Sequence, residues 1–304
     1  MREAGIALVL ASLVLTIFLF IPLKPETPQP AAAAVAVENA TSSTPDAFAN
    51  VPLTAKAAIV YDLSTGETLY AKNASAQLPL ASLTKLLTLY SALDELSPST
   101  TITIPQDVMG LSAPHAFSPG QSFTLSDLAR LTLTASLNDG AAAIAEATAN
   151  QEHTSVKDMM AHTAAQLNLA QTYAVNGNGL DMNTAISGGY GSAHDIAVLA
   201  GALVAKAADI VSATTQPTAS AVSEQGQSFT VKNTDPVVVN IPGLLLSKTG
   251  YTDLAGGNLV LVFDTGLGHP VAVVVLGSTE KARFTDGEAL VAATLAHFAG
   301  VKSL

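Results

Sequence analysis

Cysteine is absent from this 304-residue sequence, and charged side chains make up only 12% of it. The absence of cysteine excludes structural disulfides, thiolate metal ligands, a cysteine nucleophile and a lipidated N-terminal cysteine. The six histidines never occur at the spacing of a zinc hydrolase motif, so we expect neither a metal site nor another cofactor. With 13 lysines and arginines against 24 aspartates and glutamates, the net charge of -11 argues against nucleic acid as a partner.

The N-terminal part of the sequence predicts export from the cytoplasm. Residues 5–21 form an apolar run close to the ~20 residues that span a bilayer. Several prolines follow the run before the alanines at 31–34, which favours an uncleaved membrane anchor over a cleaved signal peptide. We therefore interpret residues 1–22 as an anchor or signal segment and the stretch 23–50, rich in Pro, Ala, Ser and Thr, as an extended linker.

The remaining residues, 51–304, are numerous and apolar enough for one large domain with a substantial core. Two runs at its start, 58–63 and 67–71, flank a Ser-Thr-Gly turn and predict a β-hairpin. Three near-continuous apolar runs close to the end have the character of buried strands, and the short turns between them require antiparallel pairing. These runs are 244–247, 259–263 and 271–276, with turns expected at Gly256-Gly257 and at 265–268.

Helical periodicity fills the middle of the domain and recurs at its end. Helices are expected over 82–96, over 125–149 with an interruption at Asn138-Asp139-Gly140, and over 155–168, 192–207 and 282–298. The order of elements indicates a mixed α/β fold. Both ends of the domain contribute strands to one antiparallel sheet, helices cover the sheet, and a helical insertion lies between.

The candidate chemistry begins with Ser82 and Lys85, a Ser-x-x-Lys pair at the start of a predicted amphipathic helix. This spacing places both side chains on one helix face, where a neutral lysine could take the serine proton. The pattern alone is weak, because Ser278 and Lys281 repeat it in the same chain. A metal-independent serine nucleophile is therefore one hypothesis, and a capping serine beside a solvated lysine is the other.

Two further motifs strengthen the first hypothesis. Ser136-Leu137-Asn138 lies where two helices are expected to break, and Lys248-Thr249-Gly250 ends the first apolar run. Taken singly, the former could be a helix cap and the latter a strand running into a turn. All three motifs in this order, each in a fitting structural setting, are much harder to obtain by chance.

The three motifs and several longer phrases resemble the D-alanyl-D-alanine carboxypeptidases, the low-molecular-mass penicillin-binding proteins among the penicilloyl-serine transferases. The similarity extends from about Ala55 to Phe298. It implies a five-stranded antiparallel sheet flanked by helices, with an all-helical subdomain and a catalytic cleft between the two parts. The phrases are Ala81-Ser82-Leu83-Thr84-Lys85, Pro119-Gly120-Gln121, Ser126-Asp127-Leu128, Asn138-Asp139-Gly140-Ala141, Asn178-Gly179-Leu180-Asp181 and 248–256 from Lys248-Thr249-Gly250-Tyr251 onwards.

The resemblance also implies roles for individual residues. Ser82 would attack the carbonyl of the penultimate D-Ala with Lys85 as its base, Ser136 would pass a proton to the leaving D-Ala, and Asn138 would hold the substrate amide. The backbone N–H groups of Ser82 and Tyr251 would form the oxyanion hole.

A second group of residues would bind the terminal carboxylate of the substrate. Lys248 and Thr249 of the third motif, with Gly250 beside them, would face it, and Arg283 is the candidate for an additional contact. A solvated charge at a helix start is the other interpretation of Arg283. The expected partners are peptidoglycan stem peptides as substrates and β-lactams as covalent inhibitors, with the membrane contacted through the N-terminal segment.

Several alternatives remain open at this level. The family includes D,D-endopeptidases that cut peptidoglycan crosslinks, and a non-catalytic β-lactam sensor could keep the same serine. A class A β-lactamase would need a glutamate that activates water, but the comparable phrase starts with Ala164. Leu137 replaces a more usual glycine and could narrow the cleft. The extra β-domain and C-terminal amphipathic helix of some relatives have no counterpart here, so attachment would depend on the N-terminus.

Overall fold

The computed structural model describes residues 46–300. The expected anchor, 1–22, and nearly all of the expected linker lie outside the described residues. Ala47 and Phe48 are buried, so packed structure begins upstream of residue 51.

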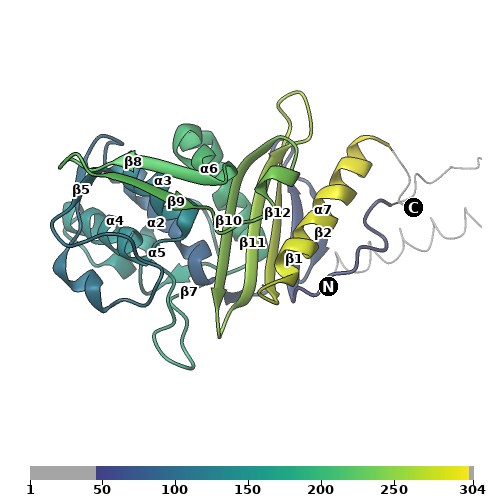
Figure 1. Ribbon diagram of the computed structural model, residues 1–304. Coiled ribbons are helices and arrows are strands. Elements are labelled where there is room, and N and C mark those ends of the chain that lie inside the picture. The colour runs from purple at the N-terminus through teal and green to yellow at the C-terminus, as the bar shows by residue number, and fades with distance from the viewer. Residues whose placement is uncertain (1–45, 301–304) are drawn as a thin grey trace, which may run out of the picture. The chain divides into compact units, whose positions relative to one another are not determined.

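A five-stranded antiparallel sheet, built from both ends of the described chain, forms one half of the domain (Figure 1). Two strands come from the predicted N-terminal hairpin, and three come from the predicted C-terminal meander, so the sequence-based topology is confirmed. The strands run in the order β10 (Leu244–Thr252), β11 (Gly256–Asp264), β12 (Pro270–Ser278), β1 (Ala57–Asp62) and β2 (Thr68–Lys72). Strand β10 therefore lies at an edge of this sheet.

Alternating side chains of the central strands supply two separate cores, as the period of two along a strand requires. On one face, Ile59, Val260 and Val274 join the core shared with most of the helices. On the other face, Val60 and Leu261 pack with residues of the C-terminal helix α7 (Ala282–Phe298). Both faces of the central strands are buried, which explains why these strands are near-continuous apolar runs in the sequence.

Helix α6 (Ala193–Val211) packs against β12 and β1 opposite α7. Together with the following turn, it forms the one helical stretch of the described residues that is long and apolar enough to span a membrane. Its apolar residues Ile196, Leu199 and Leu203 belong to the domain core, which accounts for that composition.

The other half of the domain is mostly helical and lies beside β10 (Figure 1). Its main helices are α2 (Thr84–Glu95), α3 (Leu125–Ala135), α4 (Asn138–Gln151) and α5 (Val156–Gln166). Short strands pair between them: β3 (Leu78–Pro79) with β7 (Gly189–Gly191) and β6 (Tyr173–Ala174), β4 (Thr101–Thr103) with β5 (Ser122–Thr124), and β8 (Thr218–Val222) with β9 (Ser228–Lys232). The described residues also form four short 3-10 turns: η1 (Ala81–Leu83), η2 (Gln106–Gly110), η3 (Ser212–Thr215) and η4 (Val238–Asn240).

Two predicted boundaries were wrong. The helical break falls at Ser136 and Leu137 rather than at 138–140, because the left-handed backbone of Ser136 (φ 58°) ends α3 and Asn138 starts α4. Gly256 and Gly257 lie within β11 rather than in a turn. Their lack of a side chain serves close packing, since a Cβ on Gly257 would lie 2.0 Å from the carbonyl oxygen of Thr279.

One buried side chain connects the sheet to the segment that precedes the first motif. Asn258 on β11 is fully buried; its Nδ2 donates to the carbonyl of Pro79 (2.9 Å), and its Oδ1 accepts from the N–H of Gly277 (2.8 Å). It therefore fixes the chain just before Ser82 against the sheet.

Replacing Asn258 by alanine should destabilise the protein by about 2–4 kcal/mol, because two buried backbone groups lose their partners. Urea unfolding followed by circular dichroism measures the change as a lower midpoint. Asn150→Ala, at an exposed position of α4, is the matched control and should change stability by less than about 0.5 kcal/mol. Equal midpoints for the two variants would contradict this role of Asn258.

Candidate active site

Ser82 lies in η1, the short turn that leads into α2, and the sheet packs directly against it. Ala81 before it has a left-handed backbone (φ 48°), a conformation that non-glycine residues adopt only when the surroundings enforce it. On β10, a Cβ at Gly250 would lie 2.9 Å from the carbonyl oxygen of Leu80 and 3.3 Å from the nitrogen of Ser82. Glycine at this position therefore allows β10 to approach the serine closely.

Lys85 reaches back one helical turn to Ser82, as the Ser-x-x-Lys spacing predicted. Its Nζ lies 2.8 Å from the Ser82 Oγ, 2.8 Å from the Oδ1 of Asn138 and 2.7 Å from the carbonyl oxygen of Asn178. A neutral amine has two N–H donors and one lone pair. The two carbonyl oxygens can take the donors, which leaves the lone pair directed at the serine hydroxyl.

The surroundings of Lys85 favour that neutral form. The side chain is 1% exposed, and burial is the main reason why its pKa lies well below the ordinary value of 10.5. The ammonium of Lys248 lowers the pKa further, and the carboxylate of Asp139 opposes the shift in part. Lys85 can therefore act as a base.

The second and third motifs meet beside this pair. The Nζ of Lys248 on β10 donates to the Oγ of Ser136 at 2.9 Å and to the carbonyl of Thr249 at 2.9 Å. Burial and the neighbouring Arg283 lower the pKa of Lys248 to about 7. A bound anion would raise that pKa again, because an opposite charge favours the ammonium.

Arg283 at the start of α7 is buried, so the alternative of a solvated surface charge is wrong. Its Nη1 donates to the carbonyl of Gly250 at 2.9 Å, which places the guanidinium behind β10 near Lys248. The hydroxyl of Thr249 lies 2.6 Å from that of Thr234. All three predicted motifs and Arg283 are thus brought together at one edge of the sheet.

The second Ser-x-x-Lys pair is structural. The Oγ of Ser278 donates to the buried carboxylate of Asp286 (2.7 Å), while Lys281 is exposed.

Leu137 is buried in the helical core and does not narrow the cleft, contrary to expectation. Ala164 is buried in the same core.

The sequence analysis did not identify three groups that hold the site residues in place. The carbonyl of Asn178 holds Lys85, and the carbonyl of Ser112 accepts from the Nδ2 of Asn138 at 2.9 Å. The carboxylate of Asp139 accepts from three backbone N–H groups, those of Ala116, Phe117 and Gly140. It fixes the 112–117 loop beside Asn138. The role of a backbone carbonyl cannot be predicted from a sequence, because every residue has one. A structural role for the Asp139 side chain could have been predicted, because the residue directly follows the second motif.

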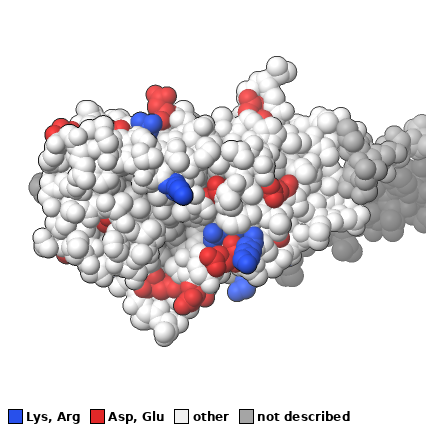
Figure 2. Space-filling model, viewed as in Figure 1, with Lys and Arg blue, Asp and Glu red and all other residues white. Residues whose placement is uncertain are grey.

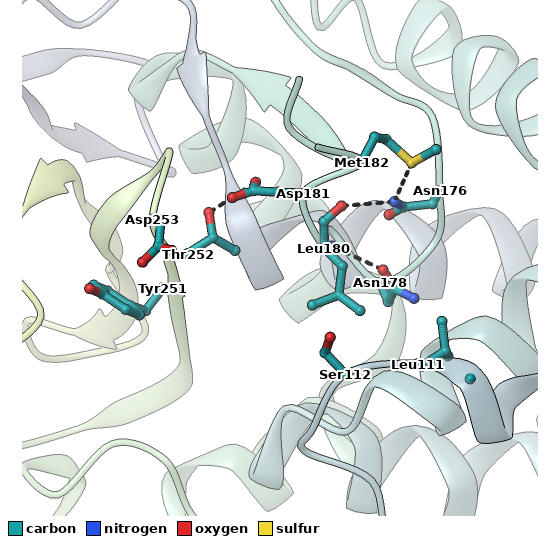
Figure 3. Close-up of a pocket in the computed structure, with 11 residues that line it drawn as sticks. Leu111, Ser112, Asn176, Asn178, Leu180, Asp181, Met182, Tyr251, Thr252 and Asp253 are labelled. Carbon is teal, nitrogen blue, oxygen red and sulfur yellow. Dashed lines mark hydrogen bonds between the residues drawn. The ribbon is translucent and has the colours of Figure 1, made fainter. Parts of the chain in front are cut away.

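A pocket of about 620 Å³ adjoins these residues on the side of Asn178 and Tyr251 (Figure 3). Its walls come from residues 110–112, from the 176–182 loop and from residues 251–253, where β10 ends. No group of His, Cys, Asp and Glu side chains suited to a metal ion occurs among residues 46–300. The arrangement suits attack by Ser82 on a carbonyl group whose neighbouring carboxylate is held by Lys248 and Arg283.

Comparisons with known proteins agree with this geometry. The family model described as D-alanyl-D-alanine carboxypeptidase matches residues 39–280. The chain is 31% identical over 235 residues to the D-alanyl-D-alanine carboxypeptidase DacF of Bacillus subtilis, covering 75% of this chain and 59% of DacF. It is 34% identical over 202 residues to DacB2 of Mycobacterium tuberculosis, covering 65% of this chain and 66% of DacB2. The match therefore spans less than two thirds of the length of these curated relatives.

Solved structures of penicillin-binding proteins are also similar to this chain. Penicillin-binding protein D2 from Listeria monocytogenes in its ampicillin-bound form superposes with a TM-score of 0.68 at 27% identity, covering 80% of this chain and 98% of that one. A penicillin-binding protein homologue from Mycobacterium tuberculosis superposes with a TM-score of 0.72 at 26% identity, covering 81% and 94%. With a serine, two buried lysines and their partners arranged as described, this chain belongs to the D-alanyl-D-alanine carboxypeptidase family of serine D,D-peptidases.

Proposed function

We propose that this chain is a serine-type D-Ala-D-Ala carboxypeptidase that acts on peptidoglycan stem peptides through an acyl-enzyme on Ser82. The observation that carries the proposal is the buried Lys85, whose Nζ lies 2.8 Å from the serine oxygen with its other two positions occupied by carbonyl groups. We place the domain outside the cytoplasmic membrane, attached by residues 1–22, since its substrate lies there.

In the first step, Ser82 attacks the carbonyl carbon of the penultimate D-Ala while Lys85 takes the hydroxyl proton. The new C–O bond converts the carbonyl oxygen into an oxyanion. The backbone N–H groups of Ser82 and Tyr251 are the donors for this oxyanion, and fixed donors of this kind stabilise a developing charge without reorganising. Collapse of the intermediate breaks the C–N bond and leaves the acyl-enzyme.

The leaving D-Ala nitrogen needs a proton as that bond breaks. Ser136, hydrogen-bonded to the Lys248 ammonium, passes its hydroxyl proton to the amine. It takes in exchange the proton that Lys85 removed from Ser82, so Lys85 is neutral again in the acyl-enzyme. Asn138 uses one N–H of its amide for the Ser112 carbonyl, which leaves the other N–H for the substrate amide. Water then attacks the ester carbonyl while the neutral Lys85 takes one of its protons. The C–O bond to Ser82 breaks, Lys85 returns the proton to the serine oxygen, and the shortened peptide leaves with a free carboxyl group.

The terminal carboxylate of the substrate is bound by charge and hydrogen bonding. Lys248 and Arg283 supply two cations beside the edge strand, and Thr249 supplies a hydroxyl. Gly250 keeps the strand close to Ser82, so the carboxylate and the scissile carbonyl are held at a fixed separation. This arrangement fits a peptide that ends in a free D-Ala carboxylate, as the proposed substrate does.

The direct test is to incubate the full chain with a stem pentapeptide ending in D-Ala-D-Ala and, separately, with a D,D-crosslinked peptide dimer. Mass spectrometry should show release of one D-Ala from the pentapeptide at a rate well above cleavage of the dimer. Faster cleavage of the dimer would make the protein an endopeptidase. No cleavage of either substrate by a folded protein that β-lactams acylate would make it a sensor.

Benzylpenicillin should form a single, long-lived adduct with the protein, because the ring nitrogen stays tethered after opening and no carboxylate among residues 46–300 is hydrogen-bonded to Ser82 or Lys85. The carboxylate of Asp139, which influences Lys85, is already occupied by three N–H donors. Intact-protein mass spectrometry should show one penicilloyl group on the wild type and none on Ser82→Ala, with Lys85→Ala reacting far more slowly. Rapid turnover of penicillin would favour a β-lactamase, and an adduct on Ser82→Ala would mean that the nucleophile is another residue.

Arg283→Ala should lower kcat/KM for the pentapeptide by a factor that corresponds to about 2–4 kcal/mol, because a charge-assisted contact with the carboxylate is lost. A pentapeptide ending in D-alaninamide has no carboxylate charge, so its already low kcat/KM should change much less. Lys281→Ala, an exposed neighbour, is the control and should leave both values unchanged. Equal losses for the two peptides would show that Arg283 only supports Gly250 and does not bind the substrate.

A further inference from the structure

Asp235 is a buried carboxylate that takes no part in the bond-breaking steps. It lies in the chain between β9 and β10 and is 2% exposed. Its Oδ1 accepts from the N–H of Val237 at 2.9 Å, and its Oδ2 accepts from the hydroxyl of Ser247 at 2.5 Å. It forms no salt bridge with any residue of the described range 46–300. An asparagine could bond to both groups, so these hydrogen bonds alone do not require a charge.

Three consecutive residues fix this carboxylate against the edge strand. The Nδ2 of Asn233 donates to the carbonyl of Thr214 at 2.7 Å, and its Oδ1 accepts from the N–H of Asp235 at 2.9 Å. The hydroxyl of Thr234 lies 2.6 Å from the hydroxyl of Thr249 on β10. The Asp235 carboxylate is therefore held beside the part of β10 that faces the substrate carboxylate.

Two buried cations lie near this carboxylate. Burial and the Arg283 guanidinium lower the pKa of Lys248 to about 7, whereas the negative charge of Asp235 raises it. Asp235 also raises the pKa of Arg283. The surface over β8, β9 and β10 carries few charged side chains (Figure 2), so the buried charges act mainly on one another.

The other titratable groups around these cations come from four parts of the chain: Lys85 on α2, Asp139 on α4, Tyr251 on β10 and Glu280 just before α7. Lys85 is kept neutral for catalysis, and Asp139 acts on Lys85. Tyr251 and Glu280 are exposed, so water weakens their effect on Arg283. Asp235 differs from all four groups, because it is a buried anion that acts on both cations.

We propose that Asp235 is a positioning residue for the substrate carboxylate: its buried negative charge balances Lys248 and Arg283, so that Lys248 stays charged to a higher pH. The inference rests on the proposed peptidase function and deepens it. Without this anion, two neighbouring buried cations would repel each other, and Lys248 would lose its proton more easily. With it, the arriving carboxylate meets two charged donors, and its binding takes up fewer protons from the solvent.

The test measures kcat/KM over a range of about pH 5 to 9 for a pentapeptide ending in D-Ala-D-Ala and for its D-alaninamide counterpart. Both peptides need neutral Lys85, so its titration cancels in the ratio of the two values. In the wild type, the ratio should fall with rising pH through a midpoint of about 7, as Lys248 loses its proton. In Asp235→Asn the midpoint should move roughly one pH unit lower, because the supporting negative charge is gone. At pH values below both midpoints, the ratio for the variant should equal or exceed that of the wild type.

Asp195→Asn is the matched control. Asp195 at the start of α6 is also buried, and it accepts from one backbone N–H and one hydroxyl, those of Gln171 and Thr172. Its variant should leave the midpoint in place. Asp235→Ala/Ser247→Ala removes the same charge together with its hydroxyl partner, so it should reproduce the shift even where Asp235→Asn does not fold. A folded charge-removing variant with an unchanged midpoint, or with an equal drop of the ratio at every pH, would overturn the proposal.

Calorimetry with Ser82→Ala separates this inference from the peptidase function. The ratio of the Kd values of the two peptides should depend on pH in the same direction, and the added Asp235→Asn change should shift that dependence to lower pH. Shifted binding with no hydrolysis by the wild type would refute the peptidase function and leave the role of Asp235 intact. Hydrolysis with a pH dependence that Asp235→Asn does not alter would refute the role of Asp235 and leave the peptidase function intact.

Discussion

The chemistry of this domain depends on the hydrogen bonds around one buried amine. Lys85 has three oxygen neighbours within 2.8 Å, and two of them, the Asn138 amide and the Asn178 carbonyl, can only accept. A neutral lysine satisfies all three oxygens when the Ser82 hydroxyl donates to it. Burial and the nearby Lys248 ammonium favour the same neutral state, so geometry and electrostatics agree.

This arrangement requires both halves of the domain. The helical part supplies the serine, Lys85 and the two carbonyl groups, whereas the sheet supplies Lys248 and the close approach of Gly250. Asn258 connects the sheet to the chain just before the serine, and Asp139 holds the loop that supports Asn138. The fold thus encloses a lysine that would be protonated if it were exposed to water. The polar groups around this lysine are buried with it, and each of them depends on its hydrogen bonds within the protein.

Much of this could be predicted from the sequence. Periodicity located the closing helix and the terminal strands, because those segments are buried on defined faces. The order of three short motifs singled out Ser82 as the candidate nucleophile, where one motif could not. Ser278 and Lys281 show the same spacing, but Ser278 binds the buried Asp286 and Lys281 is exposed. The position of the helical break was missed because it depends on the left-handed backbone of Ser136, which its residue type does not reveal. The role of the Asn178 carbonyl was likewise hidden, since every residue has one.

The most direct test of the account is the pH dependence of the second-order rate constant for acylation of Ser82 by a β-lactam, which reports ionisations of the free enzyme. The account predicts that the rate rises with pH through an apparent pKa well below 10.5, as Lys85 loses its proton. In Lys248→Gln the rising limb should move to higher pH, because removal of a neighbouring positive charge makes Lys85 easier to protonate. A limb near 10.5 in the wild type, or one that stays in place in Lys248→Gln, would contradict the claim that Lys85 is a base kept neutral by its surroundings.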